Sequence, residues 1–460
     1  MKRFLTFVVF VLILGSVAYF ALNRTDSSDG TAPAIAGAPA TADVLARGEY
    51  LAKAADCTAC HTVPGSGKPF AGGVAFRLPF GTIYSSNITA DAQTGIGRWS
   101  DDDFVRAVRE GVRKDGKRLY PAFPYTSYTQ LSRSDVLAIK AYLFSLPKIP
   151  LPDQPNALGF PFNQRWAMGF WNAAFFKSQR FVADASKSPQ WNSGAYLAGA
   201  LGHCAECHTP RNVGFGLEHG NELAGEVLQG WRAYNITSDT AHGIGAWSDG
   251  EIASYLSTGH ADGRGSASGP MGEAVDNSLQ YLKPEDTTAL VIYLRSVPAR
   301  EGRDPITIDA KAAPALASSN TAPGGDSADA NSAGLKLFES ACASCHQWNG
   351  QGQETPYASL LGTRGVNDIN GANVTQVILH GSRMRLDGHD VFMPAFGHAY
   401  SDTEVAALAN YVIAHFGNKQ GAVTTEAVAQ SRKLKIALAD MASIQTGDGM
   451  RHRRLRVVSI

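Results

Sequence analysis

The sequence has few residues that could form disulfides or metal sites, and those it has follow one pattern. Only six cysteines occur in 460 residues, all six fall into three pairs, and none is left over. The 41 basic residues balance the 41 acidic ones, so no overall electrostatic field favours nucleic acid as a partner. At roughly 100–200 residues per domain, the length suggests three domains or four.

Each cysteine pair is followed at once by a histidine. The three groups are Cys57, Cys60 and His61; Cys204, Cys207 and His208; and Cys342, Cys345 and His346. Two thiols on one turn of chain can reach the two vinyl groups of a haem, and the adjacent imidazole then lies under the ring as the proximal iron ligand. Three alternatives explain the threefold recurrence less well: disulfides, a thioredoxin-like motif, and a zinc site, which would need further ligand pairs. The sequence therefore predicts three covalently bound haem c groups.

Part of the chain is an internal repeat. Asn87-Ile88-Thr89 recurs as Asn235-Ile236-Thr237, and Trp99-Ser100-Asp101 recurs as Trp247-Ser248-Asp249, in both cases 148 residues later. The first two haem motifs are 147 residues apart, so they belong to two copies of one unit. Two interpretations of the repeated Asn, Thr and Trp stay open, namely donors to haem propionates or a turn beside a core tryptophan.

Apolar periodicity predicts a helix that leads into each haem motif and a closing helix that crosses it. The expected helices are residues 44–55, 101–110 and 133–146, then 194–201, 249–257 and 284–296, then 335–341, 374–379 and 403–416. Ser100 is expected to cap the helix at 101–110. No run of residues indicates strands convincingly. The predicted fold is all-α, with three tandem class I-type cytochrome c domains plus an N-terminal membrane segment. We refer to residues 43–148, 194–299 and 334–417 as domains one, two and three.

The first 22 residues differ from the rest of the chain. Lys2 and Arg3 precede an uncharged, largely apolar run over residues 4–22. Its length favours an uncleaved membrane anchor over a cleaved signal, and the basic residues would stay cytoplasmic. Either interpretation exports the body of the protein, which in a bacterium means the periplasmic side of the inner (cytoplasmic) membrane. Residues 23–42 are expected to form a tether.

Three further segments lie between or after the domains. Residues 149–193 are rich in aromatic side chains, which favours packing against domains one and two, with a docking surface for a partner subunit as the alternative. Residues 300–333 have few large apolar side chains and are expected to form a flexible linker. Residues 418–460 are expected to be a tail, either with an interfacial helix or solvated.

The sixth iron ligand decides what each haem does, and methionine suits electron transfer. Met393, followed by Pro394, comes 47 residues after His346, and Met384 is the only other methionine of domain three. Met271 is the one methionine of domain two, where His219, His242 and His260 are possible rivals. Core packing is the alternative role for both methionines. The predicted iron ligands are His61, His208, Met271, His346 and Met393.

Domain one departs from this pattern. Phe123 stands where the repeat places Met271, no methionine occurs between Met1 and Met168, and no other histidine than His61 occurs before His203. Three explanations stay open: an open or weakly ligated iron covered by Phe123, which we favour, a ligand from Met168, or a ligand from another subunit.

These motifs, together with Leu119-Tyr120-Pro121-Ala122, resemble those of the tri-haem cytochrome c subunits of membrane-bound periplasmic dehydrogenases, typical of acetic acid bacteria, over residues 43–417. The resemblance implies an electron-transfer subunit without substrate chemistry of its own. A catalytic subunit, with a further small redox subunit, would oxidise the substrate, and electrons would pass along the haems to ubiquinone in the membrane.

The resemblance also bears on the partner. Alcohol-type members usually have methionine where this chain has Phe123, and the Pro121-Ala122-Phe123-Pro124 variant is more similar to cytochromes that accompany molybdenum hydroxylases. A molybdenum-containing aldehyde dehydrogenase is therefore the favoured partner. A quinoprotein alcohol dehydrogenase and a flavoprotein sugar or gluconate dehydrogenase are the alternatives. A haem peroxidase is less consistent with the sequence, because domain one has no second histidine to serve as a distal acid–base group.

Overall fold

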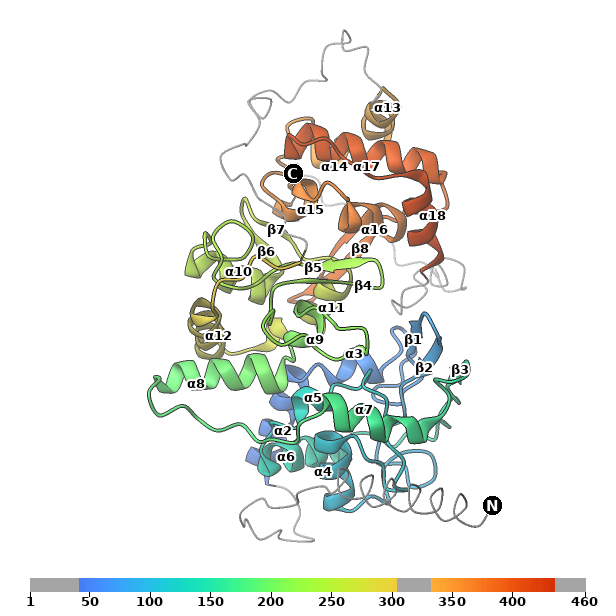
Figure 1. Cartoon of the computed structure of the whole chain (residues 1–460), viewed down its shortest axis with the longest axis vertical. Coiled ribbons are helices and arrows are strands. Elements are labelled where there is room, and N and C mark those ends of the chain that lie inside the picture. The colour runs from blue at the N-terminus through green and yellow to red at the C-terminus, as the bar shows by residue number, and fades with distance from the viewer. Residues whose placement is uncertain (1–40, 304–331, 354, 435–460) are drawn as a thin grey trace, which may run out of the picture.

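The computed structural model describes residues 41–303, 332–353 and 355–434. Domain one lies at one end of the long axis, domain three at the other, and domain two between them (Figure 1). The predicted membrane segment, residues 1–22, lies outside the described residues, as do most of the tether and most of the linker. Within the described residues no helix has both the length and the apolar character needed to cross a bilayer.

Domain one and the aromatic segment after it contain helices joined by short strands. The helices are α2 (Ala42–Ala54), α3 (Cys57–His61), α4 (Asp101–Glu110), α5 (Tyr125–Tyr128), α6 (Arg133–Ser145), the 3₁₀ turn η1 (Arg165–Ala167) and α7 (Met168–Phe175). The strands are β1 (Ala75–Leu78), β2 (Gly81–Tyr84) and β3 (Ala157–Leu158), in one antiparallel sheet.

Domain two repeats this order. Its helices are α8 (Pro189–Tyr196), the π-helical turn η2 (Leu197–Leu201), α9 (Ala205–His208), α10 (Asp249–Thr258), α11 (Gly269–Asn277), η3 (Leu279–Tyr281) and α12 (Pro284–Ser296). Its strands are β4 (Glu226–Leu228) paired with β5 (Trp231–Ala233), and β6 (His260–Ala261) paired with β7 (Gly265–Ser266).

Domain three is a smaller version with one longer hairpin. Its helices are α13 (Ser332–Ala341), α14 (Ala343–His346), η5 (Pro356–Ala358), α15 (Arg364–Asn367), α16 (Ala372–His380) and α17 (Asp402–Gly417), and the tail after it contains α18 (Thr425–Lys433). Its hairpin pairs β8 (Ser382–Leu386) with β9 (His389–Met393).

The predicted all-α fold class is wrong, because the described residues contain nine short strands in four small antiparallel sheets. The strands are only two to five residues long, too short to produce a clear alternating pattern of apolar and polar residues. The helices were predicted better: α4 and α12 have the expected ends, and Ser100 caps α4 in a capping box with Asp103.

In every domain the helix before the haem motif crosses the closing helix at a glycine. A Cβ atom at Gly48 would clash with the carbonyl of Ala138, and one at Gly194 with that of Ala289. A Cβ atom at Gly334 would likewise clash with the carbonyl of Ala407. The three pairs α2 and α6, α8 and α12, and α13 and α17 can pack this closely only because each crossing point lacks a side chain.

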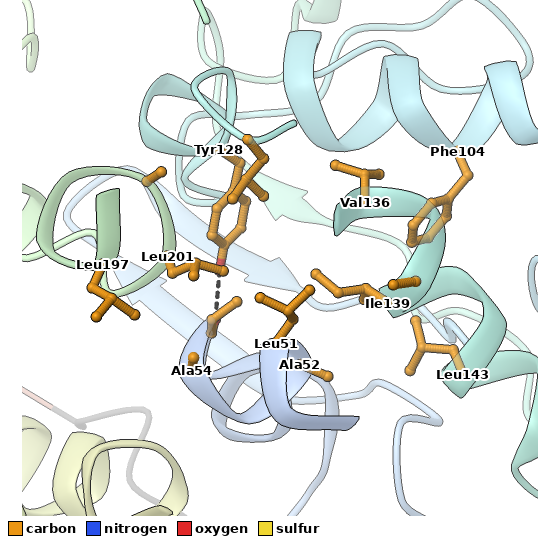
Figure 2. Close-up of a cluster of buried hydrophobic side chains, with 14 of the residues drawn as sticks. Leu51, Ala52, Ala54, Phe104, Tyr128, Val136, Ile139, Leu143, Leu197 and Leu201 are labelled. Atoms are coloured by element: carbon orange, nitrogen blue, oxygen red, sulfur yellow. Dashed lines mark hydrogen bonds between the residues drawn. The ribbon is translucent and has the colours of Figure 1, made fainter. Parts of the chain in front are cut away.

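Domains one and two share a hydrophobic core. Leu51 of α2 and Leu143 of α6 pack in one cluster with Leu197 and Leu201 of domain two, and all four are buried. Figure 2 shows these side chains converging, with the Tyr128 hydroxyl directed at the end of α2. Domain three has a core of its own.

The aromatic segment packs partly as expected. Asn172 of α7 accepts a hydrogen bond from the buried Tyr125 hydroxyl at 2.6 Å, and the Trp171 indole donates to the carbonyl of Gly214 at 2.7 Å. Phe160 and Trp166 stay largely exposed. The segment therefore joins domains one and two through α7, and part of its aromatic surface stays open.

The first part of the C-terminal tail packs against domain three. Val428 of α18 is buried in the core of that domain, and Arg432 forms an ion pair with Asp402 at 2.7 Å. Residues 435–460, which include most of the possible interfacial helix, lie outside the described residues.

Candidate haem-attachment sites

The three Cys-x-x-Cys-His motifs adopt the same local structure. Each motif ends in a short helical turn, α3, α9 or α14, directly after the helix that crosses the closing helix. None of the six cysteines, all of which lie in the described residues, forms a disulfide. Burial raises the pKa of Cys57 to about 12 and that of Cys204 to about 11. A redox-active thiol pair needs a lowered pKa, so these thiols lack the activation that the thioredoxin-like alternative requires.

The histidine of every motif is oriented by a backbone carbonyl. The distance from Nδ1 to the carbonyl oxygen is 2.8 Å for His61 and Ser86, 2.6 Å for His208 and Tyr234, and 2.6 Å for His346 and Ala358. A carbonyl can only accept a hydrogen bond, so Nδ1 carries the proton and Nε2 keeps its lone pair. This tautomer, held by a hydrogen bond at the other ring nitrogen, is the one found in metal-binding histidines.

Burial also keeps these imidazoles neutral. It lowers the pKa of His208 to about 4, and it lowers the pKa of His61 and of His346, in each case against the opposing effect of the backbone hydrogen bond. A neutral imidazole with a free Nε2 is the form that binds iron. The residues at all three motifs thus fit a covalently attached haem.

The candidate methionine ligands lie on different elements. Met271 is in the first turn of α11 and is partly buried. Met393 is the last residue of β9, and its neighbour Pro394 is exposed. The rival Met384 is 2% exposed and packs into domain two, where a Cβ atom at Gly259 would lie 2.9 Å from its sulfur. Met384 is therefore a packing residue between two domains.

The rival histidines of domain two have other surroundings. His260 has both ring nitrogens within 2.9 Å of a hydrogen-bond partner, Ser266 at Nδ1 and Asp262 at Nε2. The side chain of His219 is almost fully exposed. His242 lies 3.2 Å from Asp239. His260 and His219 are thus poorly suited to bind iron, which favours Met271.

Domain one has an aromatic side chain at the position that corresponds to Met271 of domain two. Phe123 packs against the shared core, with its ring centroid 5.4 Å from that of Tyr128. The Tyr128 hydroxyl donates to the carbonyl of Ala55 at 2.6 Å, two residues before the first motif. Met168 begins α7 and is partly buried. The ligation of the first haem stays a prediction.

The repeated Asn and Thr are structural. Asn87 accepts from the backbone and the hydroxyl of Thr89 at 2.9 and 2.7 Å, and Asn235 accepts from Thr237 at 2.8 and 2.7 Å. Their amide groups donate to backbone carbonyls, for example from Asn235 to Arg300 at 2.6 Å. These bonds support the interpretation as a turn, since the amides are already used within the chain.

Contacts between the motifs of different domains were not evident from the sequence. Glu206, inside the second motif, accepts from the Thr126 hydroxyl of domain one at 2.5 Å and forms an ion pair with Arg211 at 2.7 Å. The helix of Met271, α11, also contacts α3, the turn of the first motif. The contacts between domains join residues far apart in the chain, so no local sequence pattern predicts them.

Comparison with known families defines the class of protein. The cytochrome c family model matches residues 45–147, and the model for cytochrome c oxidase, cbb3-type, subunit III matches residues 329–412. The chain is thus a c-type cytochrome, which holds haem c covalently.

Relatives that match most of the chain identify the family more closely. The fructose dehydrogenase cytochrome subunit of Gluconobacter japonicus is 40% identical over 87% of this chain and 85% of its own length. The gluconate 2-dehydrogenase cytochrome c subunit of Pantoea cypripedii is 34% identical over 92% and 95%. The alcohol dehydrogenase (quinone), cytochrome c subunit of Gluconacetobacter polyoxogenes is 34% identical over 85% and 84%. The chain belongs to the family of cytochrome c subunits of dehydrogenases, whose role is electron transfer.

Proposed function

We propose that the chain carries three haem c groups and passes electrons from a catalytic dehydrogenase subunit to ubiquinone. The observation that carries this proposal is the Nδ1–carbonyl hydrogen bond that recurs at His61, His208 and His346. The residues proposed to hold the haems are Cys57, Cys60, His61, Cys204, Cys207, His208, Cys342, Cys345 and His346. Haem supplies one-electron redox chemistry, and the chain supplies attachment, axial ligands and a low-dielectric environment.

Two haems are proposed to have methionine as the sixth ligand. Met271 would complete the second site and Met393 the third, a ligand set that suits electron transfer. The first site, covered by Phe123, is proposed to be open or weakly ligated. Contacts between α11 and α3, and between Glu206 and Thr126, support close placement of the first two sites, which electron transfer between them requires.

The catalytic partner is proposed to be a molybdenum-containing aldehyde dehydrogenase on the periplasmic side of the inner membrane. The sequence Pro121-Ala122-Phe123-Pro124 supports this choice. Relatives that belong to fructose, gluconate and alcohol dehydrogenases match at similar identities, so a flavoprotein sugar or gluconate dehydrogenase or a quinoprotein alcohol dehydrogenase is the second candidate. The word quinone in the name of the alcohol dehydrogenase relative supports a quinone as the electron acceptor.

The first test is haem stoichiometry and electron flow in the chain purified from its native membrane. The pyridine haemochrome assay should give three haems per chain, and the co-purifying protein should identify the substrate class. Partner plus substrate should reduce the haems, and a ubiquinone analogue should reoxidise them. Two haems per chain, or rapid peroxide turnover without this relay, would contradict the proposal.

A further inference from the structure

Arg364 of domain three is buried inside domain two. It is the first residue of α15, and its side chain is 7% exposed. Its guanidinium donates to the carbonyl of Asn235 at 2.6 Å and to the carbonyl of Gly243. The same group lies over the rings of Tyr234 and Trp247, at 5.7 and 5.4 Å from the ring centroids.

The charge of Arg364 has no counter-ion among the described residues. None of the ion pairs in the described parts of the chain includes Arg364, and its Nε has no hydrogen-bond partner there. Burial lowers its pKa to about 10, so the group is still charged at neutral pH. Two carbonyls and two aromatic faces offer partial charges only, and a buried cation without an anion is costly.

Two neighbouring arginines show the usual arrangement. Arg232, at the same contact between domains two and three, pairs with the buried Asp368 at 3.0 Å. Arg264, over the same Trp247 ring, pairs with Glu251 at 3.0 Å. Each of these arginines has a carboxylate of the chain, so Arg364, which faces carbonyls and aromatic rings instead, is the exception.

The second haem motif lies next to Arg364. Tyr234, whose ring faces the guanidinium, also supplies the carbonyl that orients His208. The Tyr234 hydroxyl is buried without a hydrogen-bond partner among the described residues, and so is the indole Nε1 of Trp231, three residues earlier in the chain. Tyr234 thus brings two unpaired donors, its own hydroxyl and the Nε of Arg364, next to the second motif. In domain one the positions 148 residues earlier than Trp231 and Tyr234 hold Ile83 and Ser86, so the arrangement is particular to the second site.

We propose that Arg364 binds a propionate carboxylate of the haem held at Cys204, Cys207 and His208, so that domain three completes the haem site of domain two. The inference rests on the proposed function, because it requires a haem at the second motif. A haem carries two propionates, and a guanidinium matches a carboxylate in charge and geometry. Neutralising the propionate favours the reduced, less positive iron, so Arg364 raises the reduction potential of this haem.

The test uses the full, haem-loaded chain with the substitution Arg364→Gln. Spectro-electrochemical titration should resolve three components, and one of them should move to a lower potential while the other two stay. Haem content should stay at three per chain. Arg364→Lys keeps the charge and should restore most of the lost potential. Identical titration curves for Arg364→Gln and the starting protein would overturn the inference.

A control separates charge from loosening of the domain contact. Asn373→Ala removes two hydrogen bonds to the backbone of Arg232 at the same contact, at 2.8 and 3.0 Å, without changing any charge. It should leave all three potentials unchanged. A shift as large as that of Arg364→Gln would show that the effect arises from the contact, and would contradict the propionate assignment.

A second measurement covers the case in which Arg364→Gln does not fold. Resonance Raman propionate bands of the starting protein and of Arg364→Lys should then differ at one haem, because an ammonium group cannot reproduce a guanidinium fork. Unchanged bands would overturn the inference. Fewer than three haems in the starting protein would instead refute the proposed function, so the two failures are distinguishable.

Discussion

At the scale of single residues, Phe123 marks the chemical difference between the two repeated domains. It stands where domain two has Met271, and its ring packs against Tyr128 next to the first motif. We expect carbon monoxide to change about one-third of the reduced haem spectrum, since under our proposal one haem of three has no strong sixth ligand. Phe123→Met should abolish this response, as measured by reduced-plus-carbon-monoxide difference spectra.

Two further variants make this prediction specific. Phe160→Met introduces the same side chain at a position that is 82% exposed, and it should leave the carbon monoxide response unchanged. If Met168 is the ligand, the starting protein should not respond at all and Met168→Leu should create a response. No response in the starting protein would therefore contradict the open site.

At the scale of elements, the β8–β9 hairpin connects domain three to domain two. Met384 of β8 is almost fully buried against α11, where a Cβ atom at Gly272 would lie 3.2 Å from its Cγ. We expect Met384→Ala to cost about 2–5 kcal/mol of stability at this contact, because it removes a buried side chain and leaves a cavity. Amide hydrogen exchange should become faster in β8, β9 and α11.

Phe392 of β9 provides the matched control for this prediction. It is on the same hairpin, and its side chain is 71% exposed. Phe392→Ala should change exchange in the hairpin little, because it removes few buried contacts. Equal effects of the two variants would show that the hairpin does not depend on the burial of Met384.

A second element-scale prediction concerns the helix caps. Ser100 is the N-cap of α4 and Ser248 is the N-cap of α10, each in a capping box with the third residue of its helix. Ser100→Ala and Ser248→Ala should each reduce the free energy of unfolding by about 1 kcal/mol, since each leaves helix N–H groups without an acceptor. Chemical denaturation would measure this. Thr258→Ala, at the exposed end of α10, is a control outside the cap and should have a smaller effect.

At the scale of the whole molecule, we expect domains one and two to unfold as one cooperative unit, because they share a hydrophobic core. Leu201 of domain two is 1% exposed and lies in the cluster with Leu51 and Leu143 of domain one. Leu201→Ala should destabilise this unit by about 2–5 kcal/mol. Differential scanning calorimetry should show a single transition for both domains at a lower temperature.

The separate core of domain three provides a control for the Leu201→Ala prediction. Leu408 of α17 is also 1% exposed, but it packs in the cluster of that domain. Leu408→Ala should lower the transition of domain three and leave the joint transition of domains one and two nearly unchanged. Two separate transitions for domains one and two would contradict the shared core.

The difference between prediction and structure follows from the range of the interactions. Helices α4 and α12 are set by local capping, by apolar spacing and by proline, so their ends were predictable. The hairpin β8–β9 also had a local signal, because Asp387-Gly388 is a favoured hairpin turn and both residues have positive φ. The prediction from sequence contains no strand at this hairpin, and the two-residue strands β6 and β7 have almost no local signal of this kind.

The sequence by itself determined the haem motifs, the repeat and the missing methionine of domain one, since each of these depends on residue identity and spacing along the chain. The tertiary structure decided which residues meet across domains. It brought the carbonyls of Ser86, Tyr234 and Ala358 to the histidines, and it placed Arg364 of domain three beside Tyr234 of domain two. Such contacts form when elements far apart in the sequence bury their surfaces against each other. The spacing of apolar residues along a strand or a helix, with periods of two and 3.6 residues, does not predict which elements meet.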